Sequence, residues 1–105
     1  GLVGTGSADR TLKLFDLKMG LSKPISVMNC TDAVFCGEVL GDLAIAGCGD
    51  GNILAFDLNK GGECLYGYGA DEVGALHCMK VLPDYSGLLT GGDSGQPLKI
   101  IFSGF

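Results

Sequence analysis

The chain contains no tryptophan, a single histidine and little positive charge. Of its 105 residues, 7 are Lys or Arg and 12 are Asp or Glu, which gives a formal net charge of −5. A chain with this balance repels a phosphate backbone instead of releasing its counterions, so we do not expect it to bind nucleic acid. Glycines and charges also interrupt every apolar run before the roughly 18 residues that a membrane-spanning helix needs, which argues against a membrane association of that kind.

The five cysteines lack the spacing of a disulfide framework or a zinc module. Their number is odd and no two of them form a Cys-x-x-Cys pair, which is typical of free thiols in a reducing compartment. We therefore expect an intracellular, cytoplasmic protein. Zinc is the alternative for these cysteines, but the one histidine, His77, adjoins Cys78 without a second ligand pair. Buried apolar thiols are the favoured interpretation, and we expect no metal or other cofactor.

The 19 glycines separate short β-rich segments instead of forming a low-complexity tract. Three strand-length segments, 11–15, 52–56 and 98–102, each follow a turn rich in Gly, Asp, Ser or Asn. Further strands are expected at 25–28, 33–39, 43–46, 64–66, 74–81 and 87–90. The sequence therefore predicts an all-β chain.

These segments repeat with a period of 41 residues. The pairs at this spacing are Asp9 and Asp50, Leu12 and Ile53, Phe15 and Phe56, and Asp16 and Asp57. A third copy is looser, because Asp93 lies 43 residues after Asp50 and Leu98 lies 45 residues after Ile53. We interpret this difference as a turn at 94–97 that is two residues longer than its counterparts. The pattern indicates about four strands per repeat.

A period of about 40 to 45 residues with four short strands per unit is typical of WD40-type β-propeller blades. Segments 5–16 and 46–57 resemble the second strand, the Asp-bearing turn and the third strand of such a blade, with Phe15 and Phe56 in the position of the tryptophan. The resemblance implies about two and a half four-stranded blades of an incomplete ring. They form one unit over 1–105, with motifs that end near 16, 57 and 102.

The residues that correspond to the family's repeat motif are Thr5, Asp9, Phe15, Asp16, Asp50, Phe56, Asp57 and Asp93. In this family an Asp, a His, a Ser or Thr and the Trp of one blade form a buried hydrogen-bond network. Here Ala46 replaces the hydroxyl residue of the second repeat, and Tyr68 stands where the His is expected. Phenylalanine cannot donate as an indole does, so no repeat retains the complete network.

Closed propellers have about 4 to 8 blades, so the resemblance implies that further blades complete the ring. They come from a longer chain or from other copies of this one. Because the resemblance places Gly1 within a second strand, we interpret Gly1 as a truncation and Phe105 as lying near a true C-terminus.

Three motifs could carry chemistry, and for each we favour a structural interpretation. The segment 4–9 begins like a dinucleotide-binding loop, but Asp9 replaces its third glycine and a β-segment follows instead of a helix. The turn at 91–95 is not the Gly-x-Ser-x-Gly of a hydrolase, and a triad would need His77, which we expect to be packed in the core. The adjacent carboxylates Asp71 and Glu72 are expected to be solvated loop residues.

The resemblance implies a scaffold, without catalysis, that presents loops and blade rims to other proteins in a larger complex. We predict partner binding by Asp32, Asp71 and Glu72, in the turns that connect outer to inner strands, with Tyr68 as an exposed aromatic anchor. The acidic balance favours a basic partner segment. The alternative is the substrate-recognition part of a multidomain enzyme, such as a ubiquitin ligase, whose catalytic module lies elsewhere.

Overall fold

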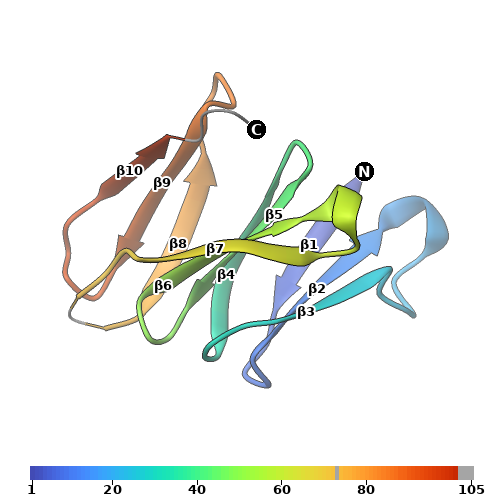
Figure 1. The fold of residues 1–105 in the computed structure, drawn as a ribbon, viewed down its shortest axis with the longest axis horizontal. Helices are drawn as coiled ribbons and strands as arrows, with labels where there is room; N and C mark the ends of the chain where they lie inside the picture. Colours follow the sequence, from blue (N-terminus) through green and yellow to red (C-terminus); the bar gives the residue numbers. More distant parts are fainter. Residues whose placement is uncertain (73, 102–105) are drawn as a thin grey trace.

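Ten strands form three antiparallel sheets in the computed structural model, which describes residues 1–72 and 74–101 (Figure 1). The first sheet contains β1 (Leu2–Gly6), β2 (Thr11–Asp16) and β3 (Ser26–Asn29); the second contains β4 (Val34–Leu40), β5 (Leu43–Cys48), β6 (Asn52–Asp57) and β7 (Glu63–Gly69); the third contains β8 (Leu76–Val81), β9 (Gly87–Gly92) and β10 (Leu98–Ile101). The all-β prediction is confirmed. The expected motif end near 102 and Phe105 lie outside the described residues.

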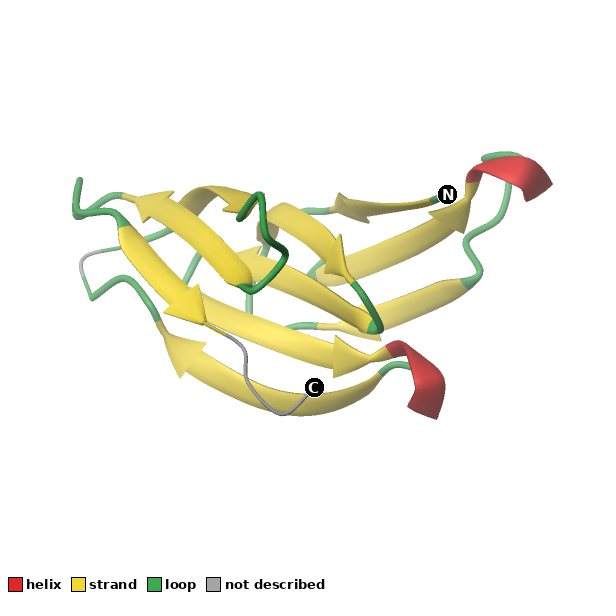
Figure 2. Ribbon diagram, turned by 90° about the horizontal axis from the view of Figure 1, so that it is seen from above, coloured by secondary structure: helices red, strands yellow, loops and turns green. Residues whose placement is uncertain are grey.

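Within each sheet the strands follow one another in chain order. Two short 3-10 helices, one between β2 and β3 and one between β6 and β7, lie on the same side of the molecule (Figure 2). These are η1 (Leu17–Met19) and η2 (Leu58–Lys60). Asp16 and Asp57 cap them in the same way, each accepting a hydrogen bond of 2.9 Å from the main-chain amide two residues later. The 41-residue spacing of these two aspartates therefore corresponds to one repeated local structure.

Three hairpins of the repeat have the same register. The paired residues are Thr5 with Lys13 in β1–β2, Ala46 with Leu54 in β5–β6, and Thr90 with Leu98 in β9–β10, eight positions apart in each case. The expected longer turn at 94–97 is therefore wrong. The strand β10 begins two positions later than β6 does in this register, directly after Pro97, which has no amide hydrogen with which to pair.

The two additional residues lie in the β8–β9 hairpin instead. In the second sheet Leu40 pairs with Leu43 across the two-residue turn at 41–42. In the third sheet the Leu82 amide donates to the Gly87 carbonyl at 2.9 Å, across the four residues 83–86. The sequence predicted both strands of this hairpin but not the additional length of its turn, because its tip, with Pro83 and Asp84, has the composition of any turn.

The second sheet lies between the other two and is buried on both faces. One face packs on the first sheet in a core of Leu12, Leu14, Met28, Val34, Ala44, Ala46, Cys48, Leu54 and Phe56. The other packs on the third sheet in a core of Leu40, Leu43, Ile45, Ile53, Ala55, Leu76 and Leu88. Every residue of β5 is buried for this reason, whereas β2 alternates between the buried Leu12 and Leu14 and the half-buried Lys13.

The strands that begin the second and third sheets, β4 and β8, run beside each other without pairing, and β1 lies on the other side of β4 (Figure 1). The outer faces of the first and third sheets are open, with Val27 and Ile101 each more than half exposed. Among the described residues, no helix has the length and apolar character to cross a membrane.

Candidate interaction surface

Five connections gather at one end of the sheets, the lower end in Figure 1. This loop end consists of the turns at 7–10, 49–51 and 93–97 and the loops at 30–33, 70–72 and 74–75. Its acidic residues are Asp9, Asp32, Asp50, Asp71, Glu72 and Asp93, half of the 12 in the chain, and Arg10 is the one Lys or Arg in these segments. The three acidic partner residues predicted from the sequence, Asp32, Asp71 and Glu72, therefore lie at an end of the molecule with strong negative charge.

The three turns of the loop end share a side-chain hydrogen bond. Asp9 accepts from the Thr11 amide at 3.0 Å, Asp50 accepts from the Asn52 amide at 3.1 Å, and the hydroxyl of Ser94 accepts from the Gln96 amide at 3.3 Å. Ser94, and not Asp93, occupies the third turn position, so the expected equivalence of Asp93 with Asp50 is wrong. The sequence could not distinguish the two residues, because Asp93 and Ser94 are adjacent and both residue types are common in turns.

The residue after each of these side chains has a left-handed backbone. Arg10, Gly51 and Gly95 have φ angles of 71°, 84° and 73°. Glycine adopts this conformation without steric cost, whereas an arginine that adopts it is strained. A Cβ at Gly51 would also collide with the carbonyl oxygens of Asp71 and Gly74. Position 51 therefore requires glycine for two reasons, the left-handed backbone and the lack of space for a Cβ.

The loops that lead into β4 and β8 are closed by carboxylates from different places in the chain. Ahead of β4, Asp32 accepts from the Ala33 amide at 2.8 Å. Ahead of β8, the equivalent Ala75 amide donates to Asp93 at 2.9 Å, and Asp93 comes from the facing hairpin. A glycine faces each carboxylate, Gly49 opposite Asp32 and Gly74 opposite Asp93. Both loops are thus closed by one carboxylate, which the loop itself supplies ahead of β4 and the facing hairpin supplies ahead of β8.

Asp71 is buried, contrary to the expectation of a solvated loop residue. It is 6% exposed, and its carboxylate accepts the amides of Gly74 and Ser94 at 3.0 Å each. Two main-chain donors of adjoining loops hold it in place, and its role is to join these loops. Glu72 beside it is exposed, as expected.

His77 is exposed, and the expectation that it packs in the core is wrong. Its Nε2 lies 2.6 Å from a carboxylate oxygen of Asp93, and its ring stacks on Phe35 of β4 at 5.7 Å between centroids. This hydrogen bond and the one from the Ala75 amide lower the pKa of Asp93. Phe35 is 51% exposed. Phe35 and His77 therefore form an exposed aromatic pair across β4 and β8, which was not predicted from the sequence.

The two residues of this aromatic pair occupy the same position in their strands. Phe35 and His77 are each the second residue of the first strand of their sheet, and both follow a buried aliphatic residue. In both strands the pairing shifts at this residue, between Val34 and Cys36 and between Leu76 and Cys78. Such a bulge turns a side chain out of the normal alternation, which sequence periodicity does not reveal.

Tyr68, the predicted aromatic anchor, is 51% exposed on β7, where it pairs with Ile53 at the edge of the second sheet. Among the repeat-motif residues, Thr5 is exposed on β1, and Phe15 is half-buried on the outer face of the first sheet. Phe56, in contrast, is 2% exposed in the core. The two phenylalanines therefore share a repeat position but not an environment.

The five cysteines are free thiols, and only Cys48 is fully buried. Cys30 and Cys36 are partly buried, and the other two are exposed, so burial of all of them was a wrong expectation. The adjacent Cys48 thiol, with burial, raises the pKa of Cys30, and burial raises the pKa of Cys36 to about 11. Both thiols are therefore protonated and poorly nucleophilic at neutral pH. In the described part of the chain, no three His, Cys, Asp or Glu side chains are grouped to hold a metal ion.

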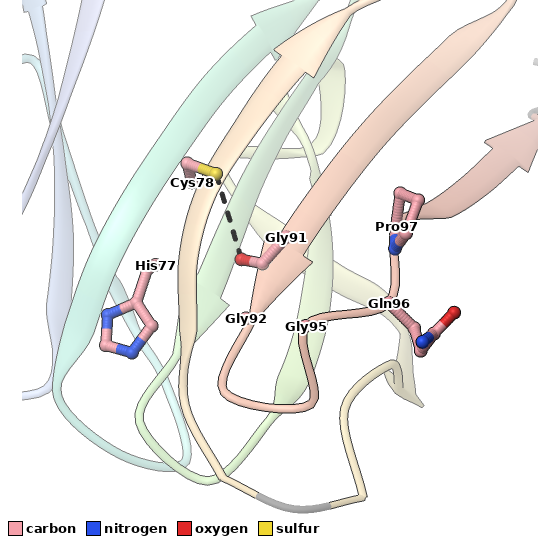
Figure 3. Close-up of a pocket in the computed structure, with 7 residues that line it drawn as sticks. All are labelled: His77, Cys78, Gly91, Gly92, Gly95, Gln96 and Pro97. Atoms are coloured by element: carbon pink, nitrogen blue, oxygen red, sulfur yellow. Dashed lines mark hydrogen bonds between the residues drawn. The ribbon is translucent and has the colours of Figure 1, made fainter.

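A hollow of about 310 Å³ opens on the third sheet beside the loop end (Figure 3). Its lining residues are His77, Cys78, Gly91, Gly92, Gly95, Gln96 and Pro97. The Cys78 thiol points to the Gly91 carbonyl, 3.8 Å away, and away from the His77 ring. The two residues therefore do not form a nucleophile and base pair, which requires direct hydrogen-bond contact. Three of the lining residues are glycines, which contribute main chain and no side chain to the hollow.

No model of a protein family matches the sequence, and no curated protein matches it either. In structure the chain is similar to two computationally designed proteins with crystal structures, Ika4, with a TM-score of 0.78, and Ika8, with a TM-score of 0.76. Each is 16% identical to this chain over 97% of its length, which corresponds to 61% of the Ika4 chain and 30% of the Ika8 chain. The chain thus spans less than two thirds of either protein. At this identity the likeness establishes a shared fold alone, an all-β arrangement of antiparallel sheets.

Proposed function

We propose that the three sheets are successive blades of a WD40-type β-propeller that serves as a non-enzymatic scaffold for protein–protein interaction. The observation that carries this proposal is the position of the second sheet, which is buried on both faces by equivalent neighbours while β4 and β8 run side by side. Sheets packed face to face with their first strands together are the arrangement of blades around an axis. In these terms β4 and β8 are innermost strands, and β1 is a second strand.

The open faces of the first and third sheets support the second part of the proposal, that further blades complete the ring. A repeat unit cannot bury its apolar face without neighbours on both sides. The outer face of the first sheet exposes Val27, and that of the third exposes Leu89 and Ile101. These blades come from further protein chain or from other molecules.

The loop end, together with the strand ends that adjoin it, is the proposed partner-binding face. Asp32 and Glu72 lie in its loops, and Phe35, Tyr68 and His77 lie in the adjoining ends of β4, β7 and β8. Exposed aromatic side chains supply contact area, and the surrounding carboxylates favour a basic segment. Asp71 takes part indirectly, because it fixes the loops that carry Glu72 and Ser94. The rigid sheets hold these loops in place, so that binding needs no movement of the scaffold.

The test compares the partners captured by the intact protein and by a Tyr68→Ala, Glu72→Lys variant. The matched control is Tyr85→Ala, Glu63→Lys, which changes the same residue types at exposed positions outside the loop end, Tyr85 in the β8–β9 connection and Glu63 at the start of β7. We expect the first variant to lose its partners and the control to keep them. Equal capture by both variants, each with the circular dichroism spectrum of the parent, would contradict the proposed binding face.

A further inference from the structure

The glycines in the second strands of the sheets receive side chains from the next sheet. A Cβ at Gly6 of β1 would lie 2.6 Å from Cγ1 of Val34, the first residue of β4. A Cβ at Gly47 of β5 would lie 2.5 Å from Sγ of Cys36 in its own sheet. From the next sheet, Cε of Met79 would lie 3.0 Å away and Cβ of Leu76, the first residue of β8, 3.3 Å away. At both contacts between neighbouring sheets, the aliphatic residue that begins the following first strand lies against the glycine, and at Gly47 Met79 of the same strand lies closer still.

The third member of this series is unfilled. Gly91 of β9 pairs with Cys78 as Gly47 pairs with Cys36, so the two glycines occupy the same position of their sheets. Within 4 Å of a Cβ at Gly91 the side chain of Cys78 is the one neighbour among the described residues, at 3.2 Å. The hollow of about 310 Å³ shown in Figure 3 opens over this glycine.

We propose that this hollow is a socket for a branched aliphatic side chain on the first strand of a further β-sheet, which docks on the outer face of the third sheet. The inference rests on the proposed function and adds the chemistry of the occupant. At the two equivalent glycines, Gly6 and Gly47, the residue of the next sheet that lies against the glycine is aliphatic. Val34 and Leu76 are 4% and 1% exposed in these contacts, so a side chain of this size is fully buried by the contact.

A second copy of this chain is not the occupant. The aliphatic residues that begin its strands β4 and β8, Val34 and Leu76, already lie against glycines of its own sheets. Its free outer face is that of the first sheet, to which Lys13 belongs by the alternation of β2. The outer face of the third sheet carries a row of Lys80, Leu89 and Lys99, which are cross-strand partners. Docked copies would therefore oppose lysine to lysine without filling the socket.

The test uses the complete 105-residue chain, extended at its C-terminus by a copy of residues 62–101. Ile101 pairs with Gly87 as Asp57 pairs with Leu43, so residue 62 of the copy follows Ile101 at the spacing at which Gly62 follows Asp57. The copy supplies the segment of β7, a first strand with Leu76, and the two strands after it. Serine replaces both cysteines of the copy, so that Cys78 of the parent chain remains as the reporter.

The measurement is the alkylation rate of Cys78 by iodoacetamide, relative to the exposed Cys64 of the parent chain. We expect the extension to slow the reaction of Cys78 about ten-fold, because alkylation then requires the docked sheet to open. A Leu76→Ser substitution in the copy alone should restore the original rate. The same fall in rate with this variant would overturn the assignment of the socket to an aliphatic side chain.

Circular dichroism and the thermal midpoint distinguish the remaining outcomes. A folded copy that raises the midpoint while Cys78 reacts at its original rate would overturn the socket and leave the proposed blade interface intact. A copy that adds neither β-structure nor thermal stability would contradict the blade interface itself, and the socket with it.

Discussion

At the scale of single residues, the left-handed turn positions of the repeats differ in what they tolerate. Gly51→Ala should destabilise the chain by more than the roughly 1–2 kcal/mol of a left-handed non-glycine residue, because its Cβ also collides with two carbonyl oxygens. Arg10→Gly removes such a strain at φ 71° and should stabilise by up to about 1 kcal/mol, after the entropy that glycine costs in the unfolded chain. Urea unfolding of both variants measures the two effects. A neutral Gly51→Ala variant would contradict the turn geometry.

The Asp93 carboxylate makes a pH-dependent contribution to stability. Its pKa is lowered from 3.8 by the His77 ring and the Ala75 amide, so the folded state binds its proton less readily than the unfolded state does. The stabilisation is therefore present above pH 3.8 and is lost as the pH falls through the lower folded value. Asp93→Asn should reduce the thermal midpoint at pH 6, and the midpoints of variant and parent should converge once the pH falls below the folded pKa of Asp93. The neighbouring Glu72→Gln serves as control, and a constant difference at every pH would contradict this account.

The sequence predicted the turn carboxylates better than it predicted the surface. Asp9 and Asp50 have a local role, a bond to the amide two residues on, which composition and spacing indicate directly. Asp71 and His77 depend on contacts with distant segments, the turn at 93–97 and β4. The bulges that turn out Phe35 and His77 leave no mark in the hydrophobic pattern, so their exposure could not be predicted.

At the scale of elements, the two hairpins of the third sheet should tolerate deletion differently. Replacing residues 83–86 with Gly-Asp, the turn of the β4–β5 hairpin, should change the unfolding free energy by less than about 1 kcal/mol, because it restores the shorter loop of the second sheet. Deleting two residues from 94–97 should unfold β10, because that hairpin already has the length of its two counterparts. Urea midpoints and two-dimensional NMR spectra compare the two deletions.

The reverse result for these deletions would support the longer turn that the sequence alone suggested. Strand existence and the 41-residue repeat followed from alternation and turn residues, which are local signals. The location of the additional residues did not, because an alignment on Asp93 is as good in sequence as one on Ser94. Only strand register, which depends on hydrogen bonds between segments, separates the two alignments.

At the scale of the whole molecule, the charge and the core are distributed unequally. Half of the acidic residues lie at the loop end, and apolar burial on both faces occurs only for the second sheet among the described strands. The first and third sheets each contribute one face to the cores and leave the other open. Stability should therefore decrease outward from the second sheet, while the binding loops remain anchored to it.

Native-state hydrogen exchange measures this gradient. We expect the amides of β5 and β6 to exchange most slowly, because every opening that exposes them breaks both cores, and those of β3 and β10 to exchange fastest as edge strands. The control is a second measurement at ten-fold lower protein concentration. Protection of the first and third sheets that decreases on dilution would mean that copies cover these faces in solution, which contradicts the exclusion of a second copy. Protection that is lower in these sheets at both concentrations is the result that their open faces require.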